Sequence, residues 1–146
     1  MKKVEMLYAL DEAKKRHKEQ MHSVEKILAG KEVAKPPKVG KVECECGRWL
    51  YSDKEQMEFI IGMQLFEKID KYHDLWHREY KKIYDIYFKE KKGLISKLFS
   101  SHKVDPLDED KAKTYYKDMV VASKEFFHAI DVAHRRVSAL SEAKFK

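Results

Sequence analysis

The sequence KKVEMLYALDEAKKRHKEQMHSVEKILA, residues 2–29, has the pattern of an amphipathic α-helix. On a helical wheel of 100° per residue, its apolar side chains and one histidine lie within about 40° of a single line. These residues are Met6, Leu10, Ala13, His17, Met21, Val24 and Leu28. Gly30 follows as a stop, because glycine readily adopts the left-handed conformation that ends helices. We therefore expect the chain to begin with a helix that buries one face.

The composition of the whole chain fits a fold made of such helices. Its 146 residues (17.4 kDa) have the length of one domain, and a hydrophobic share of 43% suffices for a core. Five glycines and three prolines are too few for the many turns of a β-sandwich or barrel. Charged residues make up 38% of the chain and the mean hydropathy is -0.69, values typical of amphipathic helices. We predict one all-α domain that spans residues 1–146.

A loop is expected after the first helix. The sequence KPPKVG at residues 35–40 excludes a helix, because proline lacks an amide donor and restricts the residue before it. The loop, about fifteen residues long, leads to CECGRWLY at residues 44–51. There, two large aromatic side chains beside a glycine indicate a segment that folds back onto the helices. The fold therefore includes a long loop that carries a Cys-x-x-Gly-x-Trp segment.

Residues 53–92 contain no proline and predict a second helical region. Ser52 and Glu55 have the spacing of a capping box, which places the start of this region near Asp53. Forty residues of helix would span about 60 Å, far more than the first helix. We therefore expect a break near Gly62 or just before Asp70.

The last helix is expected at about residues 107–144, after a connection at residues 100–106. One stripe of this helix carries Ala112, Tyr116, Val120, Ser123, Phe127, Ile130, His134 and Val137. Before the connection, a short apolar set is expected to cap one end of the bundle: Leu94, Ile95, Leu98 and Phe99. Three long amphipathic segments, the middle one broken in two, together predict an antiparallel four-helix bundle.

Several features indicate a reducing, aqueous compartment. No stretch approaches 18 uncharged apolar residues, and the charged N-terminal sequence differs from a signal peptide, so we expect neither a membrane span nor secretion. Cys44 and Cys46 are one residue apart, a spacing that would give a strained and barely constraining disulfide ring. We therefore predict a cytoplasmic protein with reduced thiols.

The net charge of +6 and the isoelectric point near 9.1 suit an anionic partner, yet acidic residues are interleaved with basic ones along the whole chain. Basic runs at residues 14–18 and 89–92 are therefore interpreted as solvated helix faces. Nucleic acid is not the expected partner. A basic helical adaptor for nucleic acid or for an acidic protein stays open as an alternative function.

The seven histidines are the most informative residues of this sequence. His17 lies at the centre of the apolar stripe of the first helix, where each ring nitrogen needs a polar partner. His73 and His77 are four residues apart on one helical face, a spacing that lets two imidazoles bind one metal ion. That face also carries Ile69, Trp76 and Tyr80, so the pair is expected to point into the core. The histidines expected at the surface are His22, His102 and His128.

Zinc is the metal that these residues favour. Three histidines and one thiolate from the cysteine segment would make a closed tetrahedral zinc site. The competing interpretation is a set of inert core side chains, with the imidazoles satisfied by carbonyl groups or water. A ligand role for Cys46, and a contribution from His134 on the last helix, both stay open.

The ordered set resembles the chemoreceptor zinc-binding (CZB) domain family. Members of that family have a helical histidine, then a Cys-x-x-Gly-x-Trp segment, then a His-x-x-x-His pair, and residues 5–85 carry these motifs in the same order. Position by position, the resemblance implies that His17, Cys44, His73 and His77 bind zinc. It further implies a sensor domain without enzyme activity that responds to zinc level or to oxidation of the zinc-bound thiolate, in signal transduction and chemotaxis.

The resemblance also bears on partners. We expect a stand-alone member of the family, whose output passes through a signalling protein in trans. A homodimer is a second expectation, because exposed long helices often pair, although periodicity alone does not separate an internal stripe from an interface. The main competing function is a hemerythrin-like di-iron oxygen carrier, also a histidine-rich four-helix bundle. It requires bridging carboxylates, and the sequence contains no His-x-x-x-Glu pair.

Overall fold

The computed structural model describes residues 1–89 and 104–145, and every regular element in those two ranges is helical. In chain order the elements are α1 (Lys3–Leu28), α2 (Glu45–Leu50), α3 (Lys54–Ile61), α4 (Met63–Tyr84), the π-helical turn η1 (Asp85–Lys89), α6 (Pro106–Ala139) and the 3-10 turn η2 (Glu142–Lys144). The predicted all-α fold is confirmed. Among the described helices, none is both long enough and apolar enough to cross a membrane.

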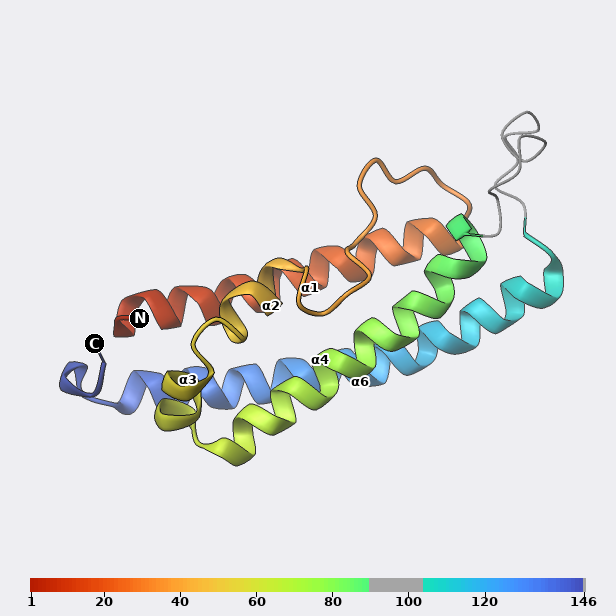
Figure 1. Cartoon of the computed structure of the whole chain (residues 1–146). Helices are drawn as coiled ribbons and strands as arrows, with labels where there is room; N and C mark the ends of the chain where they lie inside the picture. The colour runs from red at the N-terminus through yellow and green to blue at the C-terminus, as the bar shows by residue number, and fades with distance from the viewer. Residues whose placement is uncertain (90–103, 146) are drawn as a thin grey trace.

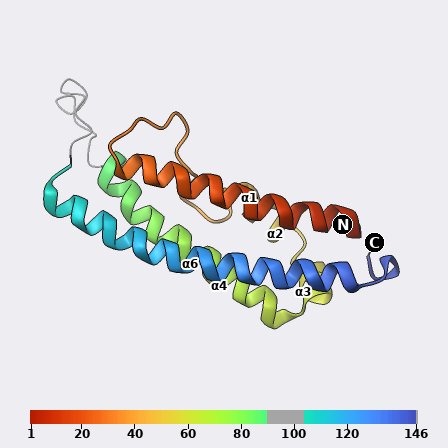
Figure 2. The ribbon, with the colours of Figure 1, turned by 180° about the vertical axis from the view of Figure 1, so that it is seen from behind.

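Three long helices form the body of the bundle (Figure 1). α1 and α4 run in one direction and α6 runs back, packed against both of them. Between α1 and α4 the chain returns through the loop at residues 29–44 and then through α2 and α3. The bundle therefore has four antiparallel segments. The second segment is not one long helix but the loop at residues 29–44 followed by the short helices α2 and α3. Figure 2 shows the same arrangement from behind, with the two termini at one end.

Gly62 breaks the second helical region at one of the two predicted places. Its φ of +90° lies in the range that side chains rarely adopt, and it separates α3 from α4. The start of the region differs from the prediction. Asp53 caps α3 instead of Ser52, because its carboxylate accepts a hydrogen bond from Gln56 N at 3.2 Å. The Ser52 hydroxyl donates to the Trp49 carbonyl, so this residue belongs to the end of α2.

Most of the predicted stripe of α1 is buried, whereas the stripe of α6 is rotated from its predicted position. Four residues expected inside are only half-buried: Tyr116, Val120, Phe127 and His134. The buried face consists of Ala112, Met119, Ala122, Ser123, Phe126, Ala129, Ile130, Ala133 and Val137. Alanine is frequent on this face because α6 packs against three other helices, and small side chains permit short distances between helix axes. The apolar cap expected at residues 94–99 lies outside the described part of the chain.

The core consists of two apolar clusters, one toward each end of the bundle. The cluster near the termini includes Met6 and Phe126, and the other includes Val24 and Met119. Along α1 and α4, the histidines predicted to bind metal occupy the junction between the two clusters. The fold therefore places its buried imidazoles between two dry regions.

Candidate metal centre

Three buried histidines converge at this junction. His17 comes from α1, and His73 and His77 come from successive turns of α4. Their relative exposures are 2%, 0% and 4%, and one ring nitrogen from each lies within 4.8 Å of the corresponding atoms of the other two. We call these three residues the histidine cluster. The pair on α4 points inward as predicted, because residues four apart share a face and this face is the buried one.

The outer ring nitrogens of two histidines are hydrogen-bonded to backbone carbonyls. His17 Nδ1 lies 3.2 Å from the Ala13 oxygen, and His77 Nδ1 lies 3.0 Å from the Val39 oxygen. Because a carbonyl can only accept, Nδ1 carries the proton in both rings and Nε2 presents its lone pair. Both Nε2 atoms are buried without a hydrogen-bond partner among the described residues. A buried lone pair without a partner is unfavourable, and a bound cation would remove that cost.

His73 is oriented by a side chain. Its Nδ1 lies 3.2 Å from the Tyr51 hydroxyl oxygen, and that hydroxyl donates to Asp70 Oδ1. The Tyr51 oxygen therefore accepts from Nδ1–H, and the lone pair of His73 Nε2 faces Cys44 Sγ, 3.2 Å away. Lys41 Nζ donates to the same Asp70 oxygen at 2.9 Å. None of these three partners was predicted from the sequence; the available signal is that Asp70 precedes His73 by three residues and so shares its helix face.

Cys44 reaches the histidine cluster from the other side. Its Sγ lies 3.2 Å from His73 Nε2. Cys44 is the N-cap of α2, and its sulfur accepts a hydrogen bond from Gly47 N at 3.2 Å. Such amide donors and the helix N-terminus stabilise a thiolate. The structure thus brings the sulfur beside the histidine cluster, with His73 as its direct neighbour.

Gly47 permits this position of the sulfur. A Cβ atom there would lie 1.7 Å from the Lys41 carbonyl oxygen and 3.1 Å from Val42 Cα. The Lys41 oxygen is also 3.2 Å from Cys44 Sγ. The glycine of the Cys-x-x-Gly-x-Trp segment therefore lets the loop backbone lie directly on the first turn of α2.

Burial keeps the histidine cluster neutral. It lowers the pKa of His17 to about 3, with a further contribution from His77, and the pKa of His73 to about 2, with contributions from His17 and His77. The pKa of His77 is lowered by burial to about 4, although hydrogen bonds to carbonyl groups oppose the shift. Burial also raises the pKa of the Cys44 thiol, against the effect of the amide donors around it. At pH 7 the polypeptide therefore offers three neutral imidazoles and one thiol.

A family comparison covers this same set of residues. Residues 17–84 match the model of the family described as the chemoreceptor zinc-binding domain. Residues 17–84 are therefore similar to a chemoreceptor zinc-binding domain, as the sequence motifs predict. The match begins at His17 and ends seven residues after His77, so it includes the cysteine segment between them. No curated protein and no solved structure gives a significant match. The family is regulatory, not catalytic, and its cofactor is zinc.

The donor atoms of this centre fit zinc, the metal of that family. Zinc binds imidazole and thiolate at about 2.0–2.3 Å, so neighbouring donors of a tetrahedral site lie about 3.3–3.7 Å apart. The 3.2 Å between Cys44 Sγ and His73 Nε2 is close to that value, and the ring nitrogens of the histidine cluster, which lie within 4.8 Å of one another, would move closer by at most about 1.5 Å. Among the described residues, no carboxylate belongs to the cluster. The bridging ligands of a di-iron carrier are therefore missing from the centre.

The other histidines of the domain do not reach the centre. His134 lies at the edge of α6, where its Nε2 is 3.3 Å from Asp11 Oδ1. This contact with α1 lies at the edge of the core, where a histidine expected on the buried stripe is only half-buried. His22 and His128 are exposed, as predicted. His102 lies outside the described residues.

Cys46 occupies a different environment from Cys44. It is buried in the apolar cluster near the termini, and none of the hydrogen bonds found in the described structure joins its sulfur to a histidine. Burial, and then the neighbouring Cys44, raise the pKa of the Cys46 thiol well above its usual value. This environment favours a core thiol and gives no geometric support to Cys46 as a ligand.

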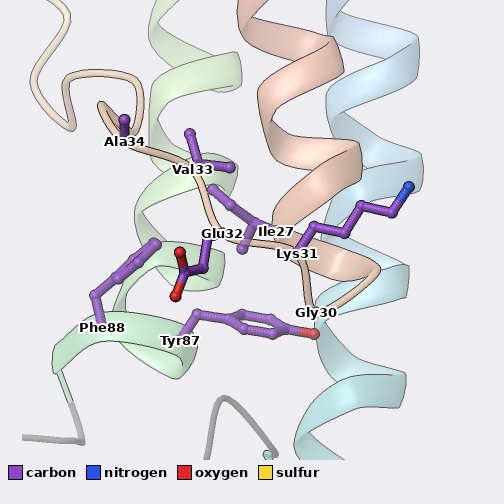
Figure 3. Close-up of a pocket in the computed structure, with 8 residues that line it drawn as sticks. All are labelled: Ile27, Gly30, Lys31, Glu32, Val33, Ala34, Tyr87 and Phe88. Atoms are coloured by element: carbon purple, nitrogen blue, oxygen red, sulfur yellow. The ribbon is translucent and has the colours of Figure 1, made fainter. Parts of the chain in front are cut away.

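Two cavities bear on how the domain could be reached from solvent. One of about 340 Å³ lies beside the loop, and its wall includes His17, Cys44 and Arg16. It gives the buried donors a route to the outside. A second cavity of about 400 Å³ lies where α1 ends beside η1 (Figure 3). Neither a histidine nor a cysteine lines this second cavity, whose wall consists of Ile27, Gly30, Lys31, Glu32, Val33, Ala34, Tyr87 and Phe88.

Proposed function

We propose that His17, Cys44, His73 and His77 bind one zinc ion with tetrahedral geometry. The observation that carries this proposal is the convergence of three buried Nε2 lone pairs, each fixed by a hydrogen bond at Nδ1. Metal-binding histidines usually make such a bond, because it sets the tautomer and the ring orientation. The cation would in turn stabilise Cys44 as a thiolate, against the effect of burial.

A site of this kind serves regulation. Four protein ligands leave zinc no open position for a water or a substrate. We therefore infer a zinc-dependent regulatory domain without enzyme activity, in which residues 1–146 form one unit. We propose a cytoplasmic location, and the two free thiols support it.

Loss of zinc, or oxidation of its thiolate, is the event that this domain reports. Cys44 is the one proposed ligand that caps a short helix, whereas the histidines lie on α1 and α4. A two-electron oxidant such as hydrogen peroxide converts a thiolate to a sulfenic acid, with the oxidant reduced to water, and sulfenic acid is a poor zinc ligand. The cavity beside His17 and Cys44 supports access of a small oxidant. Helix α2 would then lose its attachment to α4 through the metal.

The change is passed to a signalling protein in trans, and a homodimer is a further arrangement that such a bundle supports. Nucleic acid is a poorer partner. The basic run on α1 is partly neutralised, because Lys14 pairs with Asp131 at 2.9 Å and Arg16 pairs with Glu45 at 3.1 Å. The basic adaptor function therefore gains no support from these contacts.

Zinc release on oxidation tests this function. Zinc-loaded protein is treated with hydrogen peroxide, free zinc is followed with a chromophoric chelator, and oxidation of each cysteine is read by mass spectrometry. We expect one zinc released for each Cys44 oxidised, and rebinding after reduction. The matched control is Cys46→Ala, which should release zinc at the wild-type rate. Oxidation of Cys44 with zinc still bound would show that the thiolate is not the sensing group.

A further inference from the structure

Two residues on either side of Cys44 in the sequence reach one carboxylate on α4. Lys41 Nζ donates to Asp70 Oδ1 at 2.9 Å, and the Tyr51 hydroxyl donates to the same oxygen. Lys41 precedes α2 and Tyr51 is its C-cap, so one carboxylate on α4 contacts both ends of residues 41–51. Lys41 also pairs with Asp74 on α4, at 3.4 Å. We call residues 41–51 the Cys44 segment.

The same carboxylate also orients one of the imidazoles. Tyr51 receives the Nδ1–H of His73 at 3.2 Å, and its ring stacks against that of His73 with an interplanar angle of 30°. Asp70 therefore fixes, through Tyr51, both the ring plane and the tautomer of His73. It also fixes the position of Cys44, whose sulfur is the close neighbour of His73 Nε2.

We propose that Asp70, acting through Tyr51, is a positioning residue of the zinc site. This inference rests on the proposed zinc site. It adds to the site a chain of hydrogen bonds from His73 through Tyr51 to Asp70, called the relay below, which sets the zinc affinity. A carboxylate that accepts from the phenol polarises its oxygen, which strengthens the bond from Nδ1–H and makes Nε2 a better electron-pair donor. Substitution of such supporting groups typically costs about 10–100-fold in metal affinity.

The relay contributes little to the fold itself. The side chains of Lys41 and Asp70 are 31% and 35% exposed, and ion pairs as exposed as this one add little to the free energy of unfolding. The effect of removing the relay should therefore appear in zinc binding much more than in stability. This difference separates a positioning role from a structural one.

The test compares Tyr51→Phe, Asp70→Asn and the double variant. Zinc dissociation constants are measured by competition with a chelator, and cobalt(II) is substituted to record its ligand-field bands. We expect each single variant to bind zinc about 10-fold more weakly. Because the two groups act in series, the double variant should be no more than about 2-fold weaker than the weaker single variant. The cobalt bands should shift in all three, since the donor strength of His73 changes.

Two controls keep the test specific. Asp131→Asn breaks the Lys14–Asp131 pair, which also joins two helices at 2.9 Å with side chains 33% and 45% exposed. Tyr72→Phe removes a hydroxyl from the half-buried tyrosine on α4 next to His73. Both should bind zinc as the wild type does. If Tyr51→Phe fails to fold, the change Asp70→Asn, at a half-buried side chain, decides the question alone.

Several outcomes overturn the proposal. Zinc affinities of Tyr51→Phe and Asp70→Asn within about 2-fold of the wild type would show that the relay does not support the site. Unchanged cobalt bands with weakened binding would assign the residues a structural role only. A wild-type protein that binds no zinc would instead remove the proposed zinc site, and that result is recognised before any variant is made.

Discussion

The sulfur of Cys44 lies 3.2 Å from Nε2 of His73, although 29 residues separate the two in the sequence. The contact joins the N-terminus of α2 to the middle of α4, at the junction of two apolar clusters. The two side chains belong to different helices. A shared zinc ion would therefore join α2 to α4.

Zinc binding should release one proton. Burial keeps the three imidazoles neutral above about pH 5, since the highest pKa in the histidine cluster is about 4, and the pKa of the Cys44 thiol is raised. The thiol proton is then the only one that zinc displaces, so the zinc association constant should rise about 10-fold per pH unit between about pH 5 and 8. Competition titrations at several pH values measure this slope.

The Cys44→Ala variant is the control for that slope, and its residual zinc binding should be almost independent of pH over the same range. A slope near four for the wild type would mean that all three imidazoles, as well as the thiol, are protonated in the zinc-free protein. A slope near zero would mean that the sulfur is not a ligand.

The zinc-free protein should lose stability as the pH falls below about 6.5. The unfolded chain takes up protons on its histidines near this ordinary pKa, whereas the folded pKa values are about 3 for His17, 2 for His73 and 4 for His77. Because the unfolded state binds more protons, their contribution to stability is fully present above about pH 6.5 and is lost progressively as the pH falls toward these folded values. Each neutral histidine adds a slope of about 1.4 kcal/mol per pH unit to the free energy of unfolding.

Urea unfolding in the presence of a chelator, repeated between pH 4.5 and 8, measures this slope. Replacement of a buried imidazole by an apolar side chain, as in His17→Met, should reduce the slope by about 1.4 kcal/mol per pH unit, which corresponds to one proton. His22→Gln, at a side chain that is 75% exposed, should leave it unchanged. Stability that stays constant from pH 8 down to pH 5 would contradict the burial of neutral imidazoles.

Gly47→Ala should damage the site and the fold together. The added Cβ would meet the Lys41 carbonyl oxygen at 1.7 Å, so the loop must move away from α2 and from the Cys44 sulfur. We expect a loss of about 1–3 kcal/mol in the free energy of unfolding of the zinc-free protein, typical of overpacking. Zinc affinity should fall as well. Chemical denaturation and zinc competition measure the two effects.

Gly40→Ala is the matched control within the same loop. The three atoms nearest to its Cβ would all belong to the flexible side chain of Glu43, which can move aside. This variant should keep wild-type stability and zinc affinity. Equal behaviour of the two glycine variants would show that the close approach at Gly47 has no role.

Periodicity predicted most of what positions the histidine cluster. An imidazole at the centre of the stripe of α1, and a pair four residues apart on α4, are local features that any amphipathic helix preserves. The break at Gly62 was predictable for a similar reason, since helix length and glycine are both local information.

Other features depend on contacts between distant segments. The buried face of α6 follows from three neighbouring helices, and alanines such as Ala122 and Ala129 mark it less clearly than the aromatic residues beside them. The relay from Asp70 to Tyr51 depends on how the loop returns along α4. The periodicity of apolar residues predicts neither the path of this loop nor the hydrogen-bond partner of each ring nitrogen.

Metal content is the most direct test of the central claim, that Cys44 and the histidine cluster bind zinc. Wild type, Cys44→Ala and Cys46→Ala are purified without added metal and analysed for all transition metals by elemental analysis. We predict close to one zinc per chain in the wild type and in Cys46→Ala, and a large loss in Cys44→Ala. Zinc retained in full by Cys44→Ala, or iron in place of zinc in the wild type, would contradict the account.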